Sequence, residues 1–197
     1  MRFLTPMLIV PAALALAAAA SAAPVRYDVD PHHTFPSFEA DHFGISVWRG
    51  KMNKSSGTVT YDKDAGSGSV DIAVDLASID FGQDALNTWA RSGQFFNTRK
   101  FPKALYKGRF EGALNGTPAE VRGEMSLHGV TKPVVLKINS LKCVPHPMLK
   151  RELCGADALA TFRRDEFGLD AGKDYGFNMD VTLRIQVEAV AAPAVPR

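Results

Sequence analysis

The chain has 197 residues, of which 46% are hydrophobic, and 23 Lys and Arg residues stand against 21 Asp and Glu residues. At about 150 residues per domain this length corresponds to one domain. The many apolar residues and the low net charge exclude a disordered chain. A net charge of +2 gives little long-range attraction for nucleic acid, so no nucleic-acid partner is expected. Composition therefore predicts a soluble globular domain whose function depends on particular residues.

The first 22 residues have the pattern of a cleaved export signal. Arg2 supplies a positive start, an apolar run covers 7–20, and Ala20-Ser21-Ala22 offers an A-x-A cleavage site. A membrane anchor would need about 20 strongly apolar residues, whereas this run is shorter, Ala-rich and interrupted by proline. We therefore expect a cleaved signal over 1–22, a periplasmic location, a domain over 23–190 and a disordered Ala/Pro-rich tail over 191–197.

Most of the mature chain alternates between apolar and polar residues with a period of two, which is typical of half-buried β-strands. The longest alternation runs from Phe177 to Glu188. Shorter apolar patterns predict further strands at 38–42, 57–61, 70–77, 105–110, 120–127, 133–141 and 158–162. The sequence therefore predicts about eight antiparallel strands.

One segment departs from this period. Within 84–92, Leu86, Trp89 and Ala90 have helical spacing, with Asp84 as the expected N-cap and Gly93 as the expected stop. Many strands with a single helix indicate an all-β sandwich or closed barrel. Eight strands make a barrel just wide enough for packed side chains or for one small ligand. The period alone leaves open whether the interior is filled or hollow.

Two cysteines, Cys143 and Cys154, lie eleven positions apart. In an oxidising compartment such a pair most simply forms a disulfide, and closing a loop of this size stabilises the fold by about 2–3 kcal/mol. A second interpretation stays open, because Cys143, His146 and Met148 form a cluster of soft ligands like those of a blue-copper site. That electron-transfer site would require a free thiolate and a second histidine from elsewhere in the chain.

Catalytic motifs are absent from the sequence. It contains no G-x-S-x-G elbow, no H-E-x-x-H pair and no phosphate-binding glycine loop. His32 and His33 are adjacent, so on a strand they would point to opposite faces and would not chelate one metal together. We therefore predict no catalytic residues and no metal site. An enzyme acting on a lipid or a stress metabolite remains the alternative.

The segment from Met125 to Val134, MSLHGVTKPV, closely resembles the L-T-x-H-G-V-T-K-P-V signature of the YceI-like family of exported lipid-binding proteins. Further pieces follow in the order typical of the family, and the resemblance covers roughly 25–189. These pieces are Tyr27-Asp28-Val29-Asp30, Phe38 with His42 and Gly44, Phe95-Phe96, Phe101-Pro102, and Arg164 with Phe167 and Gly168. Gln94, Asn97 and Glu166 depart from the family pattern, and Met52 stands where an aromatic residue is common.

The resemblance implies an eight-stranded antiparallel lipocalin-like barrel around an elongated apolar pocket. The implied ligand is a polyisoprenoid, an isoprenoid quinone or another long-chain amphiphile, bound without covalent chemistry and without a further cofactor. Burial of about 0.8 kcal/mol per CH₂-sized group would let three or four prenyl units exceed the roughly 8 kcal/mol of micromolar binding, before ordering costs. We also expect transient contact with a membrane or a membrane redox protein, and a monomer or homodimer.

We expect the ligand to contact large aromatic side chains along the pocket and polar side chains at one end of it. Ordinary core packing is the alternative for each aromatic residue. The residues expected to line the pocket are Phe38, Trp89, Phe95, Phe96, Phe110, Phe162 and Phe167, and those expected near a polar end are His42, His128 or Arg164.

Overall fold

The computed structural model of the chain describes residues 23–193. The predicted signal over 1–22 and the last four residues of the predicted tail therefore lie outside the described residues. Within 23–193 no helix is long and apolar enough to cross a membrane. The elements are β1 (Val25–Val29), β2 (Ser37–His42), β3 (Ser46–Met52), β4 (Ser55–Asp62), β5 (Ser67–Asp75), β6 (Ile79–Asp80), α1 (Asp84–Arg91), β7 (Lys103–Glu111), β8 (Glu120–Leu127), β9 (Val130–Pro145), β10 (Glu152–Arg163) and β11 (Asp180–Ala191), with short 3-10 turns at Leu76–Ser78, Arg164–Phe167 and Lys173–Tyr175.

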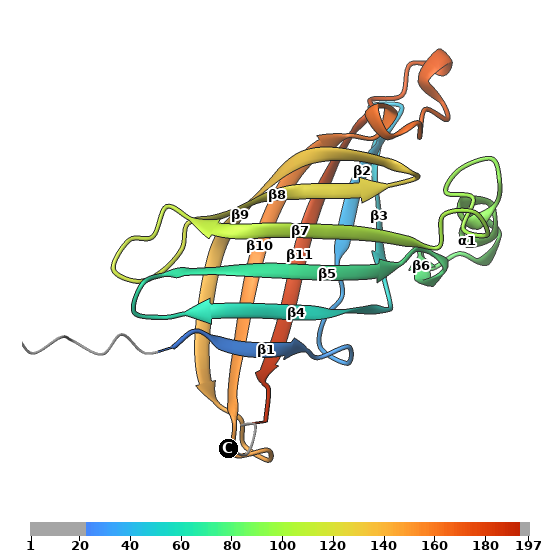
Figure 1. Ribbon diagram of the computed structural model, residues 1–197. Helices are drawn as coiled ribbons and strands as arrows, with labels where there is room; N and C mark the ends of the chain where they lie inside the picture. The colour runs from blue at the N-terminus through green and yellow to red at the C-terminus, as the bar shows by residue number, and fades with distance from the viewer. Residues whose placement is uncertain (1–22, 194–197) are drawn as a thin grey trace, which may run out of the picture.

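Eight of the strands in this described range form a closed antiparallel barrel (Figure 1). Their order around the barrel is β1, β4, β5, β7, β8, β9, β10 and β11, and the pairing of Tyr27 with Ala191 closes β1 onto β11. Because each neighbouring pair is antiparallel, short hairpin connections suffice for most of the barrel. The predicted eight-stranded antiparallel barrel is confirmed.

The other three described strands extend the sheet beyond the barrel. β2 pairs with β11, β3 pairs with β2, and β6 pairs with β3. The long strand β11 serves both parts, since its residues 181–184 pair with β2 and its residues 189–191 pair with β1. The predicted strand at 38–42 thus lies outside the closed barrel, and its expected place is taken by β1.

The short strand β1 was not among the strands predicted from alternation, because it presents only two inward side chains, Tyr27 and Val29. Between the residues that pair with β2 and those that pair with β1, the backbone of β11 forms hydrogen bonds with the segment that follows β1. Thr34 exchanges hydrogen bonds of 3.1 Å with the backbone of Glu188, and its side chain is buried. The predicted boundary at 190 also moves slightly, since the Ala192 N–H donates to the carbonyl of Arg26.

Helix α1 confirms the helical spacing of its apolar residues, but its ends differ from those predicted. The N-cap is Gln83, whose side-chain oxygen accepts a hydrogen bond from the N–H of Leu86. Asp84 lies in the first turn, where its negative charge interacts favourably with the positive end of the helix dipole. The C-cap is Ser92 rather than Gly93. Asn87 anchors the helix to the residue directly after β6, since its amide oxygen accepts from the N–H of Phe81 at 2.7 Å.

Candidate functional site

The barrel interior encloses a cavity of about 490 Å³, within the roughly 300–1,000 Å³ of small-molecule sites. All eight barrel strands contribute to its lining, together with β2, β3 and α1. Strand β11 illustrates how each strand contributes to the lining. Its alternate residues Val181, Leu183, Ile185, Val187 and Ala189 line the cavity, and the polar residues between them point outward. The interior is therefore hollow and almost entirely apolar.

The tyrosine hydroxyls of the lining are bonded to protein groups. The Tyr106 hydroxyl lies 3.0 Å and 2.9 Å from the carbonyl oxygens of Val121 and Val134. Burial raises the pKa of Tyr106 to about 12, so this hydroxyl stays protonated. The Tyr61 hydroxyl donates to the carbonyl of Gly116 at 3.0 Å. These side chains therefore satisfy their own hydroxyls and present mainly their rings to the cavity.

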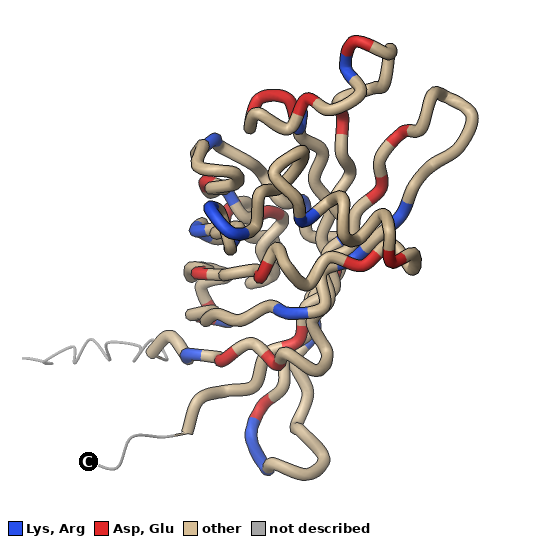
Figure 2. Tube along the Cα trace, turned by 90° about the vertical axis from the view of Figure 1, so that its right-hand side faces the viewer, with Lys and Arg blue, Asp and Glu red and all other residues tan. Residues whose placement is uncertain are grey.

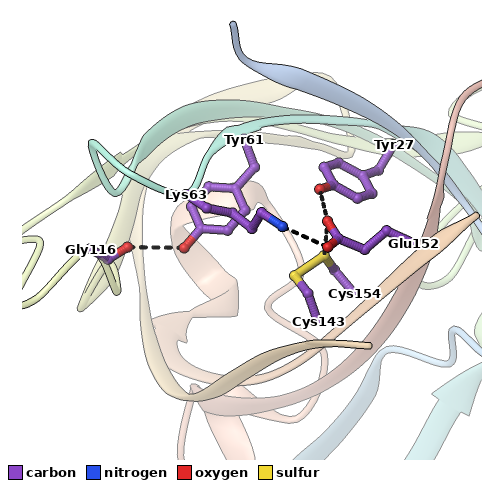
Figure 3. The surroundings of a disulfide bond; sticks show 7 residues. All are labelled: Tyr27, Tyr61, Lys63, Gly116, Cys143, Glu152 and Cys154. Atoms are coloured by element: carbon purple, nitrogen blue, oxygen red, sulfur yellow. Dashed lines mark hydrogen bonds and ion pairs between the residues drawn. A yellow bond between two sulfur atoms is a disulfide. The ribbon is translucent and has the colours of Figure 1, made fainter. Parts of the chain in front are cut away.

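One end of the barrel is crossed by a compact polar network beside the Cys143–Cys154 bond, which we call the disulfide end (Figure 3). The Tyr27 hydroxyl donates to Glu152 Oε1 at 2.5 Å, and Lys63 Nζ lies 2.6 Å from Glu152 Oε2. Burial, with the hydrogen bond to Glu152, raises the pKa of Tyr27. Burial alone would raise the pKa of Glu152, but the hydrogen bonds from Lys63 and Tyr27 hold it below its ordinary value. The network joins β1, β10 and the turn after β4.

The predicted disulfide is confirmed. Cys143 on β9 and Cys154 on β10 are direct cross-strand partners with Cα atoms 4.0 Å apart, and their sulfurs are bonded. This bond removes the free thiolate that the copper interpretation requires. In addition, His146 Nδ1 accepts hydrogen bonds from the backbone N–H groups of Met148 and Leu149, and Met148 is 81% exposed. The predicted alternative of a copper site at Cys143, His146 and Met148 is therefore wrong.

Most of the residues expected in the pocket do lie along the cavity, although their contact with a ligand stays a prediction. Three of the aromatic side chains meet at α1 and the segment that follows it. The Trp89 and Phe95 rings stack at 4.9 Å, and Phe96 meets Phe95 edge-on at 4.7 Å. The predicted residues that line the cavity are Phe38, Trp89, Phe95, Phe96, Phe110, Phe162 and Arg164.

Three of the predicted residues lie outside the cavity lining. Phe167 is 1% exposed and packs edge-on against Phe162 at 5.4 Å, so it belongs to the core behind the cavity wall. His42 stacks on Trp48 at 4.1 Å beside the cavity. His128 forms the turn between β8 and β9 with Gly129.

The position of His128 follows from the geometry of this hairpin. Both His128 and Gly129 have positive φ angles, of 52° and 82°, as a two-residue type I′ turn requires. The His128 ring lies against Phe101, and its Nδ1 is 3.2 Å from the carbonyl oxygen of Phe167. A side chain on Gly129 would collide with the Phe101 ring, since its Cβ would lie 2.7 Å from Cε1. The His128 side chain therefore packs this turn against the segments that contain Phe101 and Phe167.

The end of the barrel opposite the disulfide carries lining residues that the sequence did not single out. Trp48 on β3 and Phe177 before β11 both line the cavity. Trp48 is 37% exposed, so the cavity reaches the protein surface beside the β2–β3 hairpin. On β3, Trp48 and Met52 share a face with Gly50, which leaves room for the Phe38 ring. This W-x-G-x-M alternation was a usable signal, but glycine interrupts it.

Arg164 lies at this same end, which we call the Arg164 end. It begins the 3-10 turn after β10, and its side chain is buried although it lines the cavity. Its Nη1 and Nη2 donate to the carbonyl oxygens of Leu169 and Ala171, at 2.6 Å and 2.7 Å. The guanidinium carbon is 5.8 Å from the centre of the Phe95 ring. Desolvation by burial lowers the pKa of Arg164, but a guanidinium stays charged in proteins.

Comparison with known proteins gives concordant results. The sequence model of the YceI-like domain matches residues 27–189. A UPF0312 protein of Pseudomonas paraeruginosa is 31% identical over 180 residues, covering 90% of this chain and 92% of that protein. Protein YceI of Escherichia coli O6:H1 is 28% identical over 176 residues, covering 88% and 90% of the two chains.

Solved structures show the same fold. Burkholderia cenocepacia BcnA superposes with a TM-score of 0.67 at 19% identity, covering 82% of this chain and 99% of that one. A polyisoprenoid-binding domain from Saccharophagus degradans, implicated in plant cell wall breakdown, superposes with a TM-score of 0.62 at 16% identity. That superposition covers 85% of this chain and 99% of that one.

Proposed function

Because the chain belongs to the YceI-like family, we propose that its barrel carries a long-chain isoprenoid-type lipid, a polyisoprenoid or an isoprenoid quinone, in the periplasm. The observation that carries this proposal is the apolar cavity of about 490 Å³ inside the closed barrel. The Saccharophagus degradans neighbour, which is a polyisoprenoid-binding domain, supports the same ligand class. The lipid is bound without covalent chemistry.

The lining favours a chain-like ligand for a physical reason. A prenyl chain offers many carbon atoms and few polar atoms, and burial contributes about 0.8 kcal/mol per CH₂-sized group. The lining tyrosines Tyr61 and Tyr106 already donate their hydroxyl protons to backbone carbonyls. Affinity then comes from the length of chain that leaves water, and polar contacts at one end set the direction of the ligand.

The first experiment is a native mass spectrum of the mature protein, purified from the periplasm of its own host without detergent. We expect a bound species whose mass and organic extract match a prenylated lipid. A protein that is free of ligand, and remains so after incubation with prenyl lipids, contradicts the proposal.

A pair of variants separates ligand contact from core packing. Trp89 lines the cavity, whereas Phe167 lies behind the wall. We expect Trp89→Ala to reduce the amount of retained lipid. Phe167→Leu should lower the free energy of unfolding and leave lipid retention unchanged, because its side chain does not reach the ligand. Equal loss of lipid in both variants would assign Trp89 to the core instead.

We also propose that the lipid enters from a membrane at the Arg164 end. Figure 2 shows the hairpin between β2 and β3 projecting from the barrel without a charged residue at its tip. The tip carries Phe43, Ile45 and Val47, all exposed, and Ile45 is 81% exposed. Phe43 packs on the cavity residue Phe177 at 4.1 Å, so this apolar surface is continuous with the cavity lining. The one carboxylate at the turn, that of Asp41, accepts hydrogen bonds from the Gly44 N–H at 3.0 Å and 3.1 Å. A lipid bilayer is the partner that fits the apolar side chains of this tip beside a lipid cavity.

A further inference from the structure

The buried guanidinium of Arg164 has no acidic partner. None of the ion pairs among residues 23–193 includes Arg164. Its two hydrogen bonds go to backbone carbonyls, although a guanidinium carries five N–H donors. The residue is 7% exposed and lines the cavity. A buried charge without a counter-ion is costly, so this arrangement calls for a partner from outside the protein.

The adjacent carboxylate does not fill this role. Asp165 Oδ2 is paired at 2.9 Å with Arg163 and at 2.9 Å with Lys173, both largely exposed on the outer surface. Two cations therefore already neutralise Asp165. The chain thus separates three neighbouring charges, with Arg163 paired to the largely buried Asp165 and Arg164 turned toward the cavity.

The groups around Arg164 form part of the cavity wall. The two carbonyl acceptors belong to Leu169 and Ala171, and the guanidinium faces the Phe95 ring. All three of these residues line the cavity. The guanidinium is therefore held in a fixed orientation at the edge of an apolar space. Fixed planar donors of this kind match the oxygens of a phosphate or a carboxylate.

The disulfide end offers no equivalent site. There the carboxylate of Glu152 is satisfied by Tyr27 and Lys63. A negative head group would be repelled by Glu152 and would find both of its partners engaged. The polar end of a ligand is thus favoured at Arg164, and its apolar chain is favoured toward Tyr27.

We propose that Arg164 is the head-group site of this cavity, and that the preferred occupant is an isoprenoid-type lipid ending in an anionic oxygen group such as a phosphate. This assignment rests on the proposed lipid-carrier function and adds the chemistry of the head group. The anionic head supplies the missing counter-charge, while a neutral alcohol of the same chain supplies only a hydrogen-bond partner.

The test is a competition between geranylgeranyl phosphate and geranylgeraniol, which share one chain and differ in the head group. The protein, stripped of co-purified lipid, is incubated with an equimolar mixture in phosphate-free buffer. Bound lipid is then separated by gel filtration, extracted and quantified. We expect the phosphate to be enriched about tenfold or more, as charge-assisted hydrogen bonds in a desolvated site predict.

Matched variants locate the preference. Arg164→Gln should bring the enrichment close to one while the protein still binds geranylgeraniol alone, and Arg164→Lys should restore part of it. Arg163→Gln removes a neighbouring charge outside the cavity and should keep the full enrichment. Equal loss of both lipids in Arg164→Gln, or the same loss of preference in Arg163→Gln, would overturn the head-group assignment.

Two further outcomes separate this inference from the function on which it rests. Binding of both lipids by the unaltered protein without preference overturns the anionic head group and leaves the carrier function standing. Binding of neither lipid overturns both. Inorganic phosphate alone, added at millimolar concentration, should not displace geranylgeranyl phosphate, because the apolar chain supplies most of the affinity. Displacement by inorganic phosphate would indicate a free-anion site and overturn the lipid assignment.

Discussion

Both ends of the barrel place charged groups beside an apolar interior, but the two ends differ in how those charges are paired. At the disulfide end, Glu152 is bonded by Tyr27 and Lys63, and the cross-strand bond between Cys143 and Cys154 ties β9 to β10 (Figure 3). At the Arg164 end, a buried cation has only backbone acceptors and an exposed apolar hairpin lies nearby. One end is satisfied by its own residues, and the other calls for external partners.

This difference indicates where stability and where binding reside. Fully bonded polar groups and a covalent cross-link hold strands together and leave little for a ligand to bind. Unpaired charge and exposed apolar surface cost stability and mark sites of interaction. Substitutions at the disulfide end should therefore change the free energy of unfolding. Substitutions of the cavity-facing Arg164 and of the exposed apolar tip of the β2–β3 hairpin should mainly change binding.

The largest expected effect on stability comes from removing the disulfide. The double variant Cys143→Ala with Cys154→Ala should lower the free energy of unfolding by about 2–3 kcal/mol, because the loop between two positions eleven apart is no longer closed in the unfolded chain. Guanidinium chloride unfolding measures the loss, and reductant added to the unaltered protein serves as a second route to the open state. Geranylgeraniol binding should be retained. An unchanged unfolding midpoint would show that the disulfide end does not depend on its cross-link.

The next effect concerns the hydroxyl of Tyr27. Tyr27→Phe keeps the ring but removes a hydrogen bond to an ionised carboxylate, which costs roughly 1.5–3 kcal/mol. Tyr61→Phe is the matched control, since its hydroxyl donates to the neutral carbonyl of Gly116, a bond contributing roughly 0.5–1.5 kcal/mol. Chemical unfolding of both variants at pH 7 gives the comparison. An equal loss in the two would show that the Glu152 charge adds nothing.

The barrel was largely predictable because period-two alternation directly reports which side chains face inward. The helix near Trp89 and the cysteine pair followed from the sequence, and the strand expected over 177–188 is observed three residues further along, as β11 at Asp180–Ala191. Whether the interior is hollow did not follow, because it depends on how inward side chains of all strands fill the enclosed volume together. The place of β1 in the barrel was also hidden, since closure depends on pairing with β11 far along the chain.

The polar site was less predictable, and Arg164 and His128 show why. Both residues lie in conspicuous motifs, but sequence alone does not tell a charged residue on an exposed turn from one that points inward. Arg163 pairs with Asp165 outside the barrel, while Arg164 is buried. His128 was expected near a polar end, yet its positive φ places it in a hairpin turn. Backbone geometry beyond the strands decided both outcomes.

The ion pairs of Asp165 at the Arg164 end should make the stability of the fold depend on pH. Hydrogen bonds from Lys173 and Arg163 lower the pKa of Asp165 to about 2, against an ordinary value of about 3.9 in the unfolded chain. A carboxyl whose pKa is lower in the folded state stabilises the fold above its unfolded pKa, and this contribution is lost as pH falls from about 4 toward 2. Asp165→Asn should therefore be less stable than the unaltered protein at pH 7, with a smaller difference at pH 3. A difference that grows on acidification would contradict this assignment.

The smallest effect on stability, with a clear effect on binding, is expected at the hairpin tip. Ile45→Ser removes a largely exposed apolar side chain, so the free energy of unfolding should change by no more than about 0.5 kcal/mol. If the tip enters a bilayer, the lost burial of about 1.5–3 kcal/mol should weaken binding to phosphatidylcholine vesicles about tenfold or more. Val135→Ser alters another exposed apolar residue, 40% exposed on the barrel wall, and serves as the control.

Vesicle co-sedimentation measures the binding, and the rate at which vesicle-held geranylgeraniol reaches the protein measures the transfer. Zwitterionic vesicles are chosen because Arg49 and Lys51 beyond the tip could attract an anionic surface without insertion. We expect Ile45→Ser to slow transfer while Val135→Ser does not. Equal transfer by the two variants would contradict membrane entry at this end. If Ile45→Ser instead converts a dimer to a monomer without slowing transfer, the tip is a surface for a second copy of the chain.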